Sequence, residues 1–229
     1  MLLLDFLFPR RSLTGSEGAF VTPEECARLQ PDPVVEDRDA LRQRGIVALD
    51  HIRAAVPYRQ SLLLRRAVHT LKYKRIPGVA ETLGSLLVAG CTENTVHGLW
   101  FMVHGGQPST MYHEPSTVLC PVPLHWSRRF SRGFNQADLL ASIVSSATGI
   151  PVQPLLRRTR ATGFQAHRGR AQRLTAVRRA FRLRQCAPLP HAVILIDDLA
   201  TTGATLDACA LELKRGGVKW VEGWVVAHG

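Results

Sequence analysis

The segment best suited to chemistry runs from Val193 to Leu206. Its four leading aliphatic residues predict a strand buried on both faces, and polar side chains follow at the carboxyl end of that strand: Asp197, Asp198, Thr201, Thr202 and Thr205. Ligands bind at this edge of an open α/β sheet. Gly203 lets the backbone approach an anion, and a helix over 204–215 would add the positive end of its dipole. Two carboxylates would repel a phosphate unless they bound another group of the same ligand. The segment therefore predicts a cradle for a phosphorylated ribose, with the acidic pair on the ribose hydroxyls.

The same residues also fit an ordinary strand, turn and helix, in which Asp and Thr serve turn and cap chemistry. A turn alone does not require the whole ordered string, so we favour the cradle.

A second strand-to-loop junction follows Cys120. A strand over 116–121 leads to Val122, whose two flanking prolines fix a rigid turn, and Asn135 is a good cap for a helix over 136–148. Three arginines behind the turn are spaced to present cationic forks to a diphosphate: Arg128, Arg129 and Arg132. A structural turn with surface arginines is the alternative.

These stretches resemble two known signatures. Residues 193–205 resemble the 5-phosphoribosyl 1-pyrophosphate (PRPP) signature of type I phosphoribosyltransferases, an aliphatic strand followed by Asp-Asp and Thr-Thr-Gly-Ala-Thr. Residues 121–125 (Pro-Val-Pro-Leu-His) and 132–137 (Arg-Gly-Phe-Asn-Gln-Ala) are similar to the hallmark of the ComF family, a branch of that fold linked to DNA uptake in naturally competent bacteria. Leu-Lys-Tyr-Lys at 71–74 and the basic stretch 158–181 agree with the same family. The resemblance runs from about residue 60 to residue 229.

The resemblance implies a type I phosphoribosyltransferase-like fold, an α/β doubly wound parallel sheet with a small hood. In such a fold the ribose would be oriented by a catalytic acidic pair, Asp197 and Asp198. The 5-phosphate loop would comprise Leu199, Ala200, Thr201, Thr202, Gly203, Ala204 and Thr205. The pyrophosphate would contact Val122, Pro123, Leu124, His125, Arg129 and Arg132. A flexible basic loop would close over the ligand with Arg158, Arg160, Gln165, Arg170 and Arg173.

As an enzyme of this kind, the protein would displace pyrophosphate from PRPP with a nitrogen nucleophile, and Mg²⁺ would arrive with PRPP. The sequence does not identify the acceptor base. The alternative is a non-catalytic PRPP sensor that holds single-stranded DNA on its arginines, with Phe130, Phe134 and Phe164 interleaved for stacking. Competence proteins are further candidate partners. Lys72 could also face the site, or simply offset the dipole of its helix.

The N-terminal region differs from the rest of the chain. Four prolines and two glycines interrupt it before residue 34, and we expect an N-terminal appendage over 1–55 and a phosphoribosyltransferase-like domain over 56–229. ComF proteins often begin with two Cys-x-x-Cys pairs that form a small zinc site, whereas only Cys26 stands in the corresponding segment here. One thiolate cannot hold a tetrahedral structural zinc, so we predict a degenerate zinc-ribbon-like segment without a metal.

The net charge of +11 in 229 residues is carried mostly by arginine, and thirteen arginines stand against one acid, Asp138, between residues 127 and 184. Such a field attracts pyrophosphate groups or nucleic acid, although arginines on solvated helix faces would give the same count. No run approaches the roughly 18 apolar residues that cross a bilayer, and the charge follows the apolar N-terminal run, unlike in a secretory signal. With five cysteines at unpaired spacings, these features predict a cytoplasmic protein.

Apolar spacing predicts the order of the elements. We expect helices over 60–73, 79–89, 136–148 and 204–215, strands over 98–104, 116–121, 151–155, 193–196 and 220–226, and a mobile loop or weakly formed helix over 157–175. Strands that alternate with helices favour a parallel sheet.

Overall fold

The computed structural model describes residues 12–16, 20–59, 61–74, 76–92, 117–160, 179–184 and 189–229. Its centre is a five-stranded sheet in the order β1-β2-β7-β6-β3, formed by β1 (Val34–Glu36), β2 (His51–Pro57), β7 (Trp220–His228), β6 (Ala192–Ala200) and β3 (Thr117–Pro121). The neighbours from β2 to β3 are parallel, and only β1 at the edge is antiparallel. The predicted α/β class with a mostly parallel sheet is therefore confirmed.

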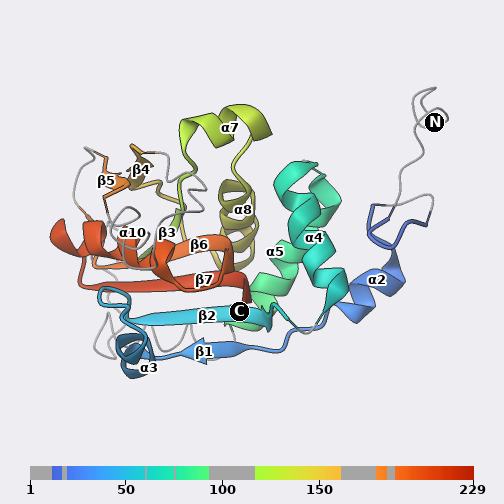
Figure 1. The fold of residues 1–229 in the computed structure, drawn as a ribbon, viewed down its shortest axis with the longest axis horizontal. Coiled ribbons are helices and arrows are strands. Elements are labelled where there is room, and N and C mark those ends of the chain that lie inside the picture. The colour runs from blue at the N-terminus through green and yellow to red at the C-terminus, as the bar shows by residue number, and fades with distance from the viewer. Residues whose placement is uncertain are drawn as a thin grey trace, which may run out of the picture.

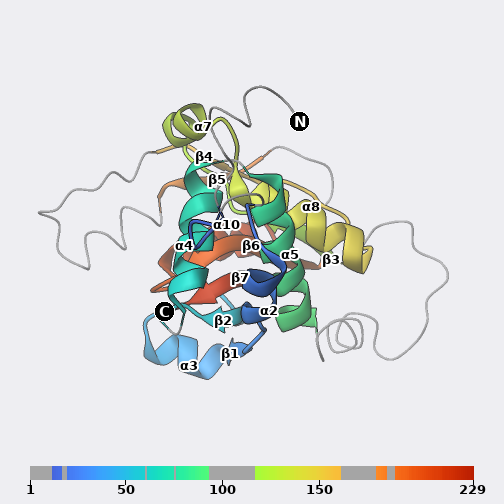
Figure 2. The ribbon, with the colours of Figure 1, turned by 90° about the vertical axis from the view of Figure 1, so that its right-hand side faces the viewer.

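Helices cover both faces of this sheet (Figures 1 and 2). One core cluster joins the sheet to α4 (Leu62–Tyr73), α5 (Pro77–Thr92) and α8 (Gln136–Thr148), and the other joins it to α10 (Ala204–Arg215) and α3 (Arg38–Gln43). Successive residues of β6 alternate between the clusters, with Ile194 and Ile196 in the first and Val193 and Leu195 in the second. The buried run of β6 is thus apolar on both faces because both faces are covered. Such double cover is compatible with a doubly wound arrangement.

Smaller elements lie around this framework. They are α2 (Pro23–Arg28), α7 (Trp126–Arg132) and a two-stranded antiparallel sheet of β4 (Leu156–Arg158) and β5 (Phe181–Leu183). Within the described part of the chain, no helix is long and apolar enough to cross a membrane.

Most predicted elements are confirmed, and two predictions were wrong. Helices 136–148 and 204–215 have the predicted bounds, whereas the strand of 193–196 extends over 192–200. The predicted strand at 151–155 is reduced to one bridge between Val152 and Leu119, because the prolines at 151 and 154 have no N–H to donate to a ladder. Residues 157 and 158 form part of β4 instead of a loop, because they pair with β5. The predicted strand at 98–104 lies outside the described residues.

The predicted domain boundary between residues 55 and 56 falls inside β2. Residues 51–57 pair with β7 near the middle of the sheet, and β1 pairs with them from the other side. β1 and the first residues of β2, which precede the predicted boundary, thus belong to the central sheet, while the division of the chain into two domains stays a prediction.

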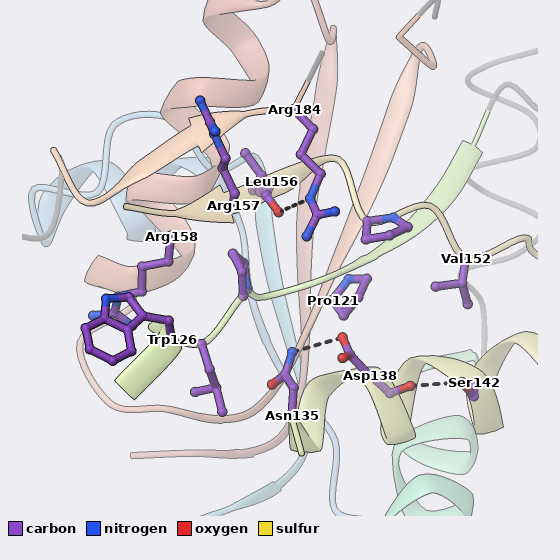
Figure 3. A pocket seen from close by; sticks show the side chains of 13 residues that line it. Pro121, Trp126, Asn135, Asp138, Ser142, Val152, Leu156, Arg157, Arg158 and Arg184 are labelled. Carbon is purple, nitrogen blue, oxygen red and sulfur yellow. Dashed lines mark hydrogen bonds between the residues drawn. The ribbon is translucent and has the colours of Figure 1, made fainter. Parts of the chain in front are cut away.

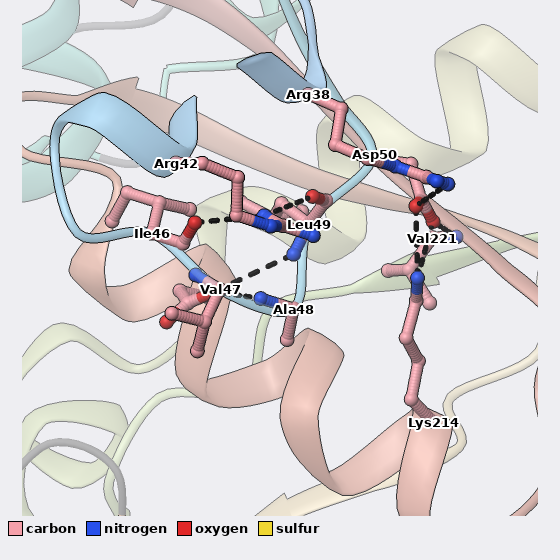
Figure 4. Close-up of polar contacts among 10 residues, drawn as sticks. Arg38, Arg42, Ile46, Val47, Ala48, Leu49, Asp50, Lys214 and Val221 are labelled. Atoms are coloured by element: carbon pink, nitrogen blue, oxygen red, sulfur yellow. Dashed lines mark hydrogen bonds and ion pairs between the residues drawn. The ribbon is translucent and has the colours of Figure 1, made fainter. Parts of the chain in front are cut away.

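A buried carboxylate fixes residues 38–50 to the sheet (Figure 4). Asp50 is fully buried and accepts from the backbone N–H of Val221 at 2.9 Å. Two cations reach the same carboxylate, Arg38 from α3 at 2.5 Å and Lys214 from α10 at 2.7 Å. One buried charge thereby joins α3 to α10 and β7, which lie near the other end of the sequence.

Candidate functional site

The acidic pair lies at the carboxyl end of β6, one residue on each face of the sheet. Asp198 continues the alternation of Ile194 and Ile196 toward α4, and it is buried. Its Oδ2 is 3.2 Å from Nζ of Lys72, yet this buried oxygen accepts no hydrogen bond from any described residue. A buried carboxylate oxygen that has an ion-pair partner but accepts no hydrogen bond can still accept one from a ligand hydroxyl or a hydrated Mg²⁺.

Asp197 carries a perturbed carboxyl group. Burial and then the neighbouring Asp198 carboxylate raise its pKa from 3.8 to about 8. Its Oδ1 accepts the backbone N–H of Asp198 at 2.9 Å, which partly offsets this effect. The pair therefore carries less than two negative charges near neutral pH, which suits a site for an anionic ligand.

This raised pKa predicts how stability depends on pH. The folded state binds a proton that the unfolded chain releases above about pH 4, so the contribution to stability is complete below that pH and is lost as the pH rises through about 8. We expect Asp197→Asn to be more stable than the wild type at pH 8.5 by at least about 1 kcal/mol, with a smaller difference at pH 5. Urea unfolding at both pH values measures this, and a difference independent of pH would contradict it.

The loop between β6 and α10 lies at the carboxyl end of β6, next to the acidic pair. β6 continues to Ala200, so the predicted phosphate residues Leu199 and Ala200 lie in the strand, and residues 201–203 form the loop. Gly203 has a φ of +74° and caps α10 without a side-chain hydrogen bond, and a Cβ there would lie 3.2 Å from Cδ1 of Ile52. A left-handed backbone in so tight a place requires glycine. The first turn of α10, with Ala204 and Thr205, follows directly.

The turn at 122–125 is hydrogen-bonded to β6 at Ile196, the residue before the acidic pair. β3 and β6 are parallel neighbours, and the N–H of Val122 donates to the carbonyl of Ile196 at 2.9 Å. The side chain of Asn135 donates to the carbonyl of Val122 at 3.2 Å and caps α8, as predicted. The predicted pyrophosphate turn therefore lies next to the predicted ribose site.

The other residues of this turn have different surroundings. His125 is buried, and its Nδ1 accepts the backbone N–H of Ser127 at 3.3 Å at the start of α7. Arg132 donates to Oε1 of Gln136 at 3.3 Å, and its guanidinium lies 5.1 Å from the ring centroid of Tyr73. The Arg129 side chain lies outside the described residues.

A pocket of about 430 Å³ lies beside the turn (Figure 3). Predicted site residues Pro123, Leu124 and Arg158 line it, together with two further arginines, Arg157 and Arg184. The remaining lining comprises Pro121, Trp126, Asn135, Asp138, Ser142, Val152, Pro154 and Leu156. Arg184 donates through Nε to the carbonyl of Leu156 at 3.0 Å, and the Arg158 guanidinium lies 5.2 Å from the Phe181 ring. The pocket combines apolar walls with three arginines and one carboxylate, Asp138, and the arginines suit an anionic group of a ligand.

Only the beginning of the predicted basic loop is described. Arg158 lies at the end of β4, and Arg160 follows it and is exposed. Gln165, Arg170 and Arg173 lie outside the described residues, so their place at the site stays a prediction. Phe134, one of three aromatic residues that we considered for stacking, is instead buried, because it packs within the core, while Phe164 lies outside the described part.

Residues from the N-terminal segment support the phosphate loop, and sequence reasoning missed them. Arg44 donates to the carbonyl of Thr201 at 3.2 Å and forms an ion pair with Glu36. Asp207 of α10 accepts the backbone N–H groups of Val47 and Ala48 at 2.9 and 2.6 Å. No local signal marks these contacts, because about 160 residues separate the partners.

The N-terminal segment offers no described metal site. Cys26 lies exposed on α2, with its Sγ 3.7 Å from Oγ1 of Thr82. No group of three His, Cys, Asp or Glu side chains that could hold a metal ion occurs among the residues that the structure describes.

Comparison with known proteins decides the family. The chain is 35% identical over 163 residues to DNA utilization protein YhgH of Salmonella typhimurium, which covers 70% of this chain and 65% of the relative. It is 31% identical over 133 residues to competence protein F of Haemophilus influenzae, or 57% of this chain and 58% of the relative. It is 32% identical over 159 residues to competence protein ComFC of Bacillus subtilis, or 69% and 62%. This chain belongs to the ComF family.

The predicted membership of the ComF family is thus confirmed, although no family model matches the chain. The chain spans less than two thirds of the length of these relatives, at 58 to 65%. The names of these ComF relatives connect them with competence and with the use of DNA.

Proposed function

We propose that this ComF protein binds Mg²⁺-PRPP at the carboxyl ends of β6 and β3 and serves DNA uptake in the cytoplasm. The observation that carries the proposal is the position of the acidic pair beside the proline turn. Asp198 is buried, its Oδ2 accepts no hydrogen bond from a described residue, and the hydrogen bond from Val122 to Ile196 brings the turn next to the pair. PRPP has ribose hydroxyls for the acidic pair, a 5-phosphate for the loop at 201–205 and a pyrophosphate for the turn. We infer the type I phosphoribosyltransferase-like fold from the same arrangement.

The proposed reaction is phosphoribosyl transfer. The bond between C1 of the ribose and pyrophosphate breaks, a bond from C1 to a nitrogen nucleophile forms, and that nitrogen loses a proton. Mg²⁺ would arrive with PRPP beside Asp197 and Asp198 and would neutralise negative charge on the pyrophosphate leaving group. Asp197 and Asp198 would orient the ribose and stabilise positive charge that develops on it. The arginines at the pocket would hold pyrophosphate.

A ligand comparison tests this proposal. Calorimetric titrations with Mg²⁺-PRPP, ribose 5-phosphate and Mg²⁺-pyrophosphate should give the tightest binding for PRPP, because only PRPP reaches all three parts of the site. PRPP that binds no tighter than pyrophosphate would contradict the cradle. Incubation of labelled PRPP with a panel of bases and amines should then release pyrophosphate. Bound PRPP with no release across the panel would favour the non-catalytic PRPP sensor.

A second candidate function is binding of single-stranded DNA. Two aromatic side chains on α7 are largely exposed, Trp126 at 72% and Phe130 at 89%, and Arg132 lies on the same helix. Exposed aromatic rings beside arginines suit base stacking with backbone contacts, and relatives named for competence and DNA utilization favour this ligand. Competence proteins that handle this strand would be its partners.

Salt dependence tests the DNA proposal. Affinity for an oligothymidine should fall steeply as salt rises, and Trp126→Ala with Phe130→Ala should weaken binding by at least about tenfold. Val35→Ala, at an exposed apolar side chain on β1, is a control that should change neither the affinity for the oligothymidine nor its dependence on salt. Affinity unaffected by salt or by the double substitution would exclude this surface.

A further inference from the structure

The carboxyl end of α4 lies between the two halves of the candidate site. Five residues of α4 pack into the core and fix its position: Leu63, Leu64, Ala67, Val68 and Leu71. The last two residues of the helix, Lys72 and Tyr73, lie beyond this apolar face. Each of them contacts a different part of the candidate site.

Lys72 turns toward the acidic pair. Its side chain is 22% exposed, although it is a lysine at a helix end, and its Nζ lies 3.2 Å from Oδ2 of the buried Asp198. Lys74, one position beyond the helix, is exposed and is equally placed to offset the helix dipole. The dipole therefore does not account for the inward direction of Lys72, whereas the charge on Asp198 does.

Tyr73 contacts the other half of the site. Its ring centroid is 5.1 Å from the guanidinium carbon of Arg132, at the end of α7 beyond the proline turn. On α4 itself the ring of His69 lies 4.7 Å from the Tyr73 ring, which limits where that ring can turn. Tyr73 is 62% exposed, so this cation–π contact is a weak attraction that favours one position of the Arg132 guanidinium.

We propose that Lys72 and Tyr73 form a third wall of the phosphoribosyl site, in which Lys72 positions Asp198 for the ribose hydroxyls and Tyr73 positions Arg132 for the pyrophosphate. This inference rests on the proposed function of the acidic pair and the turn. It assigns separate parts of one ligand to two adjacent residues of α4. The two assignments can be tested with two fragments of PRPP.

Ribose 5-phosphate and Mg²⁺-pyrophosphate separate the two roles. Lys72→Met should weaken ribose 5-phosphate about tenfold and Mg²⁺-PRPP at least as much, and Lys72→Arg should restore most of the affinity. Tyr73→Leu should weaken Mg²⁺-pyrophosphate about threefold and leave ribose 5-phosphate unchanged, with Tyr73→Phe as the variant that keeps the ring. Lys74→Met is the matched control, because it removes the same charge from the same helix end.

A double-mutant cycle identifies Asp198 as the residue through which Lys72 acts. In an Asp198→Asn background, Lys72→Met should cause no further loss of affinity for ribose 5-phosphate, because the charge that it positions is gone. If Lys72→Met weakens ribose 5-phosphate by the same factor in the Asp198→Asn background as in the wild type, the proposal is overturned. So would ribose 5-phosphate binding more tightly to Lys72→Met, since that result would make the lysine a competitor of the ligand.

Binding of Mg²⁺-PRPP to the wild type and to the lysine variants distinguishes a failure of this inference from a failure of the proposed function. If the wild type binds Mg²⁺-PRPP and Lys72→Met binds it as tightly as Lys74→Met does, the third wall is wrong and the cradle stands. If the wild type does not bind Mg²⁺-PRPP, both are wrong.

Discussion

Replacing Asp197 and Asp198 together by asparagine is expected to weaken the binding of Mg²⁺-PRPP by at least about 100-fold. At pH 8.5, above the raised pKa of Asp197, hydrogen bonds to a charged acceptor contribute about 1.5 to 3 kcal/mol each, and two of them are weakened in the double variant. Asparagine keeps the size of each side chain, so the fold should be retained. Calorimetric titration with Mg²⁺-PRPP and with Mg²⁺-pyrophosphate measures the effect.

Mg²⁺-pyrophosphate is the ligand control, because the double substitution should change its affinity in the opposite direction or not at all. Removing negative charge near an anionic ligand should leave its affinity unchanged or raise it, unless the carboxylates bind another group of that ligand. We therefore expect Mg²⁺-pyrophosphate to bind the double variant no more weakly than it binds the wild type. Asp32→Asn with Asp39→Asn, at two exposed positions, makes the same change in net charge as a control. Unchanged affinity for PRPP would exclude the acidic pair from the ribose site.

Replacing Asp50 by asparagine is expected to destabilise the fold by about 3 kcal/mol, because it removes a fully buried carboxylate on which two partly exposed cations converge. The carboxylate is fully buried and holds Arg38, Lys214 and the backbone of Val221 together (Figure 4). For a chain of this size the melting temperature should fall by about 6 to 12 °C. Denaturant unfolding and calorimetry measure the two quantities.

The site should also respond to Asp50→Asn. The segment of residues 38–50 contains Arg44, which donates to the carbonyl of Thr201, and leads into Ile52 beside Gly203. A loosened segment should therefore weaken the binding of Mg²⁺-PRPP as well. Asp32→Asn, at an exposed carboxylate in the loop before β1, should change stability by less than about 0.5 kcal/mol. A melting temperature equal to that of the control would show that the ion pairs at Asp50 contribute nothing to the fold.

Features with local causes could be predicted from the sequence. α8 begins at its Asn135 cap and ends at Gly149, which has a φ of +75°, and both residues act on their immediate neighbours. β6 could be recognised because its aliphatic run is covered on both faces, and the loop after it because Gly203 is needed there. These local features are sufficient to predict that the acidic pair lies where a buried strand ends, at the carboxyl-end side of the sheet.

Features with distant causes could not be predicted. Asp207 reads as an ordinary acidic residue in the first turn of a helix, and only the fold shows that it holds the backbone at residues 47 and 48. The sequence allows two alternatives for Lys72, because its partner Asp198 lies far away along the chain. The pairing of 157–158 with 181–182 was missed for the same reason, since arginine-rich strands have no apolar pattern.

A crystal structure of the protein with Mg²⁺-PRPP tests the central proposal most directly. We expect the ribose hydroxyls within hydrogen-bonding distance of Asp197 and Asp198, the 5-phosphate on the backbone N–H groups of residues 201–205, and the pyrophosphate at the turn of residues 122–125. PRPP bound away from the carboxyl end of β6, or with its ribose turned away from both carboxylates, would contradict it.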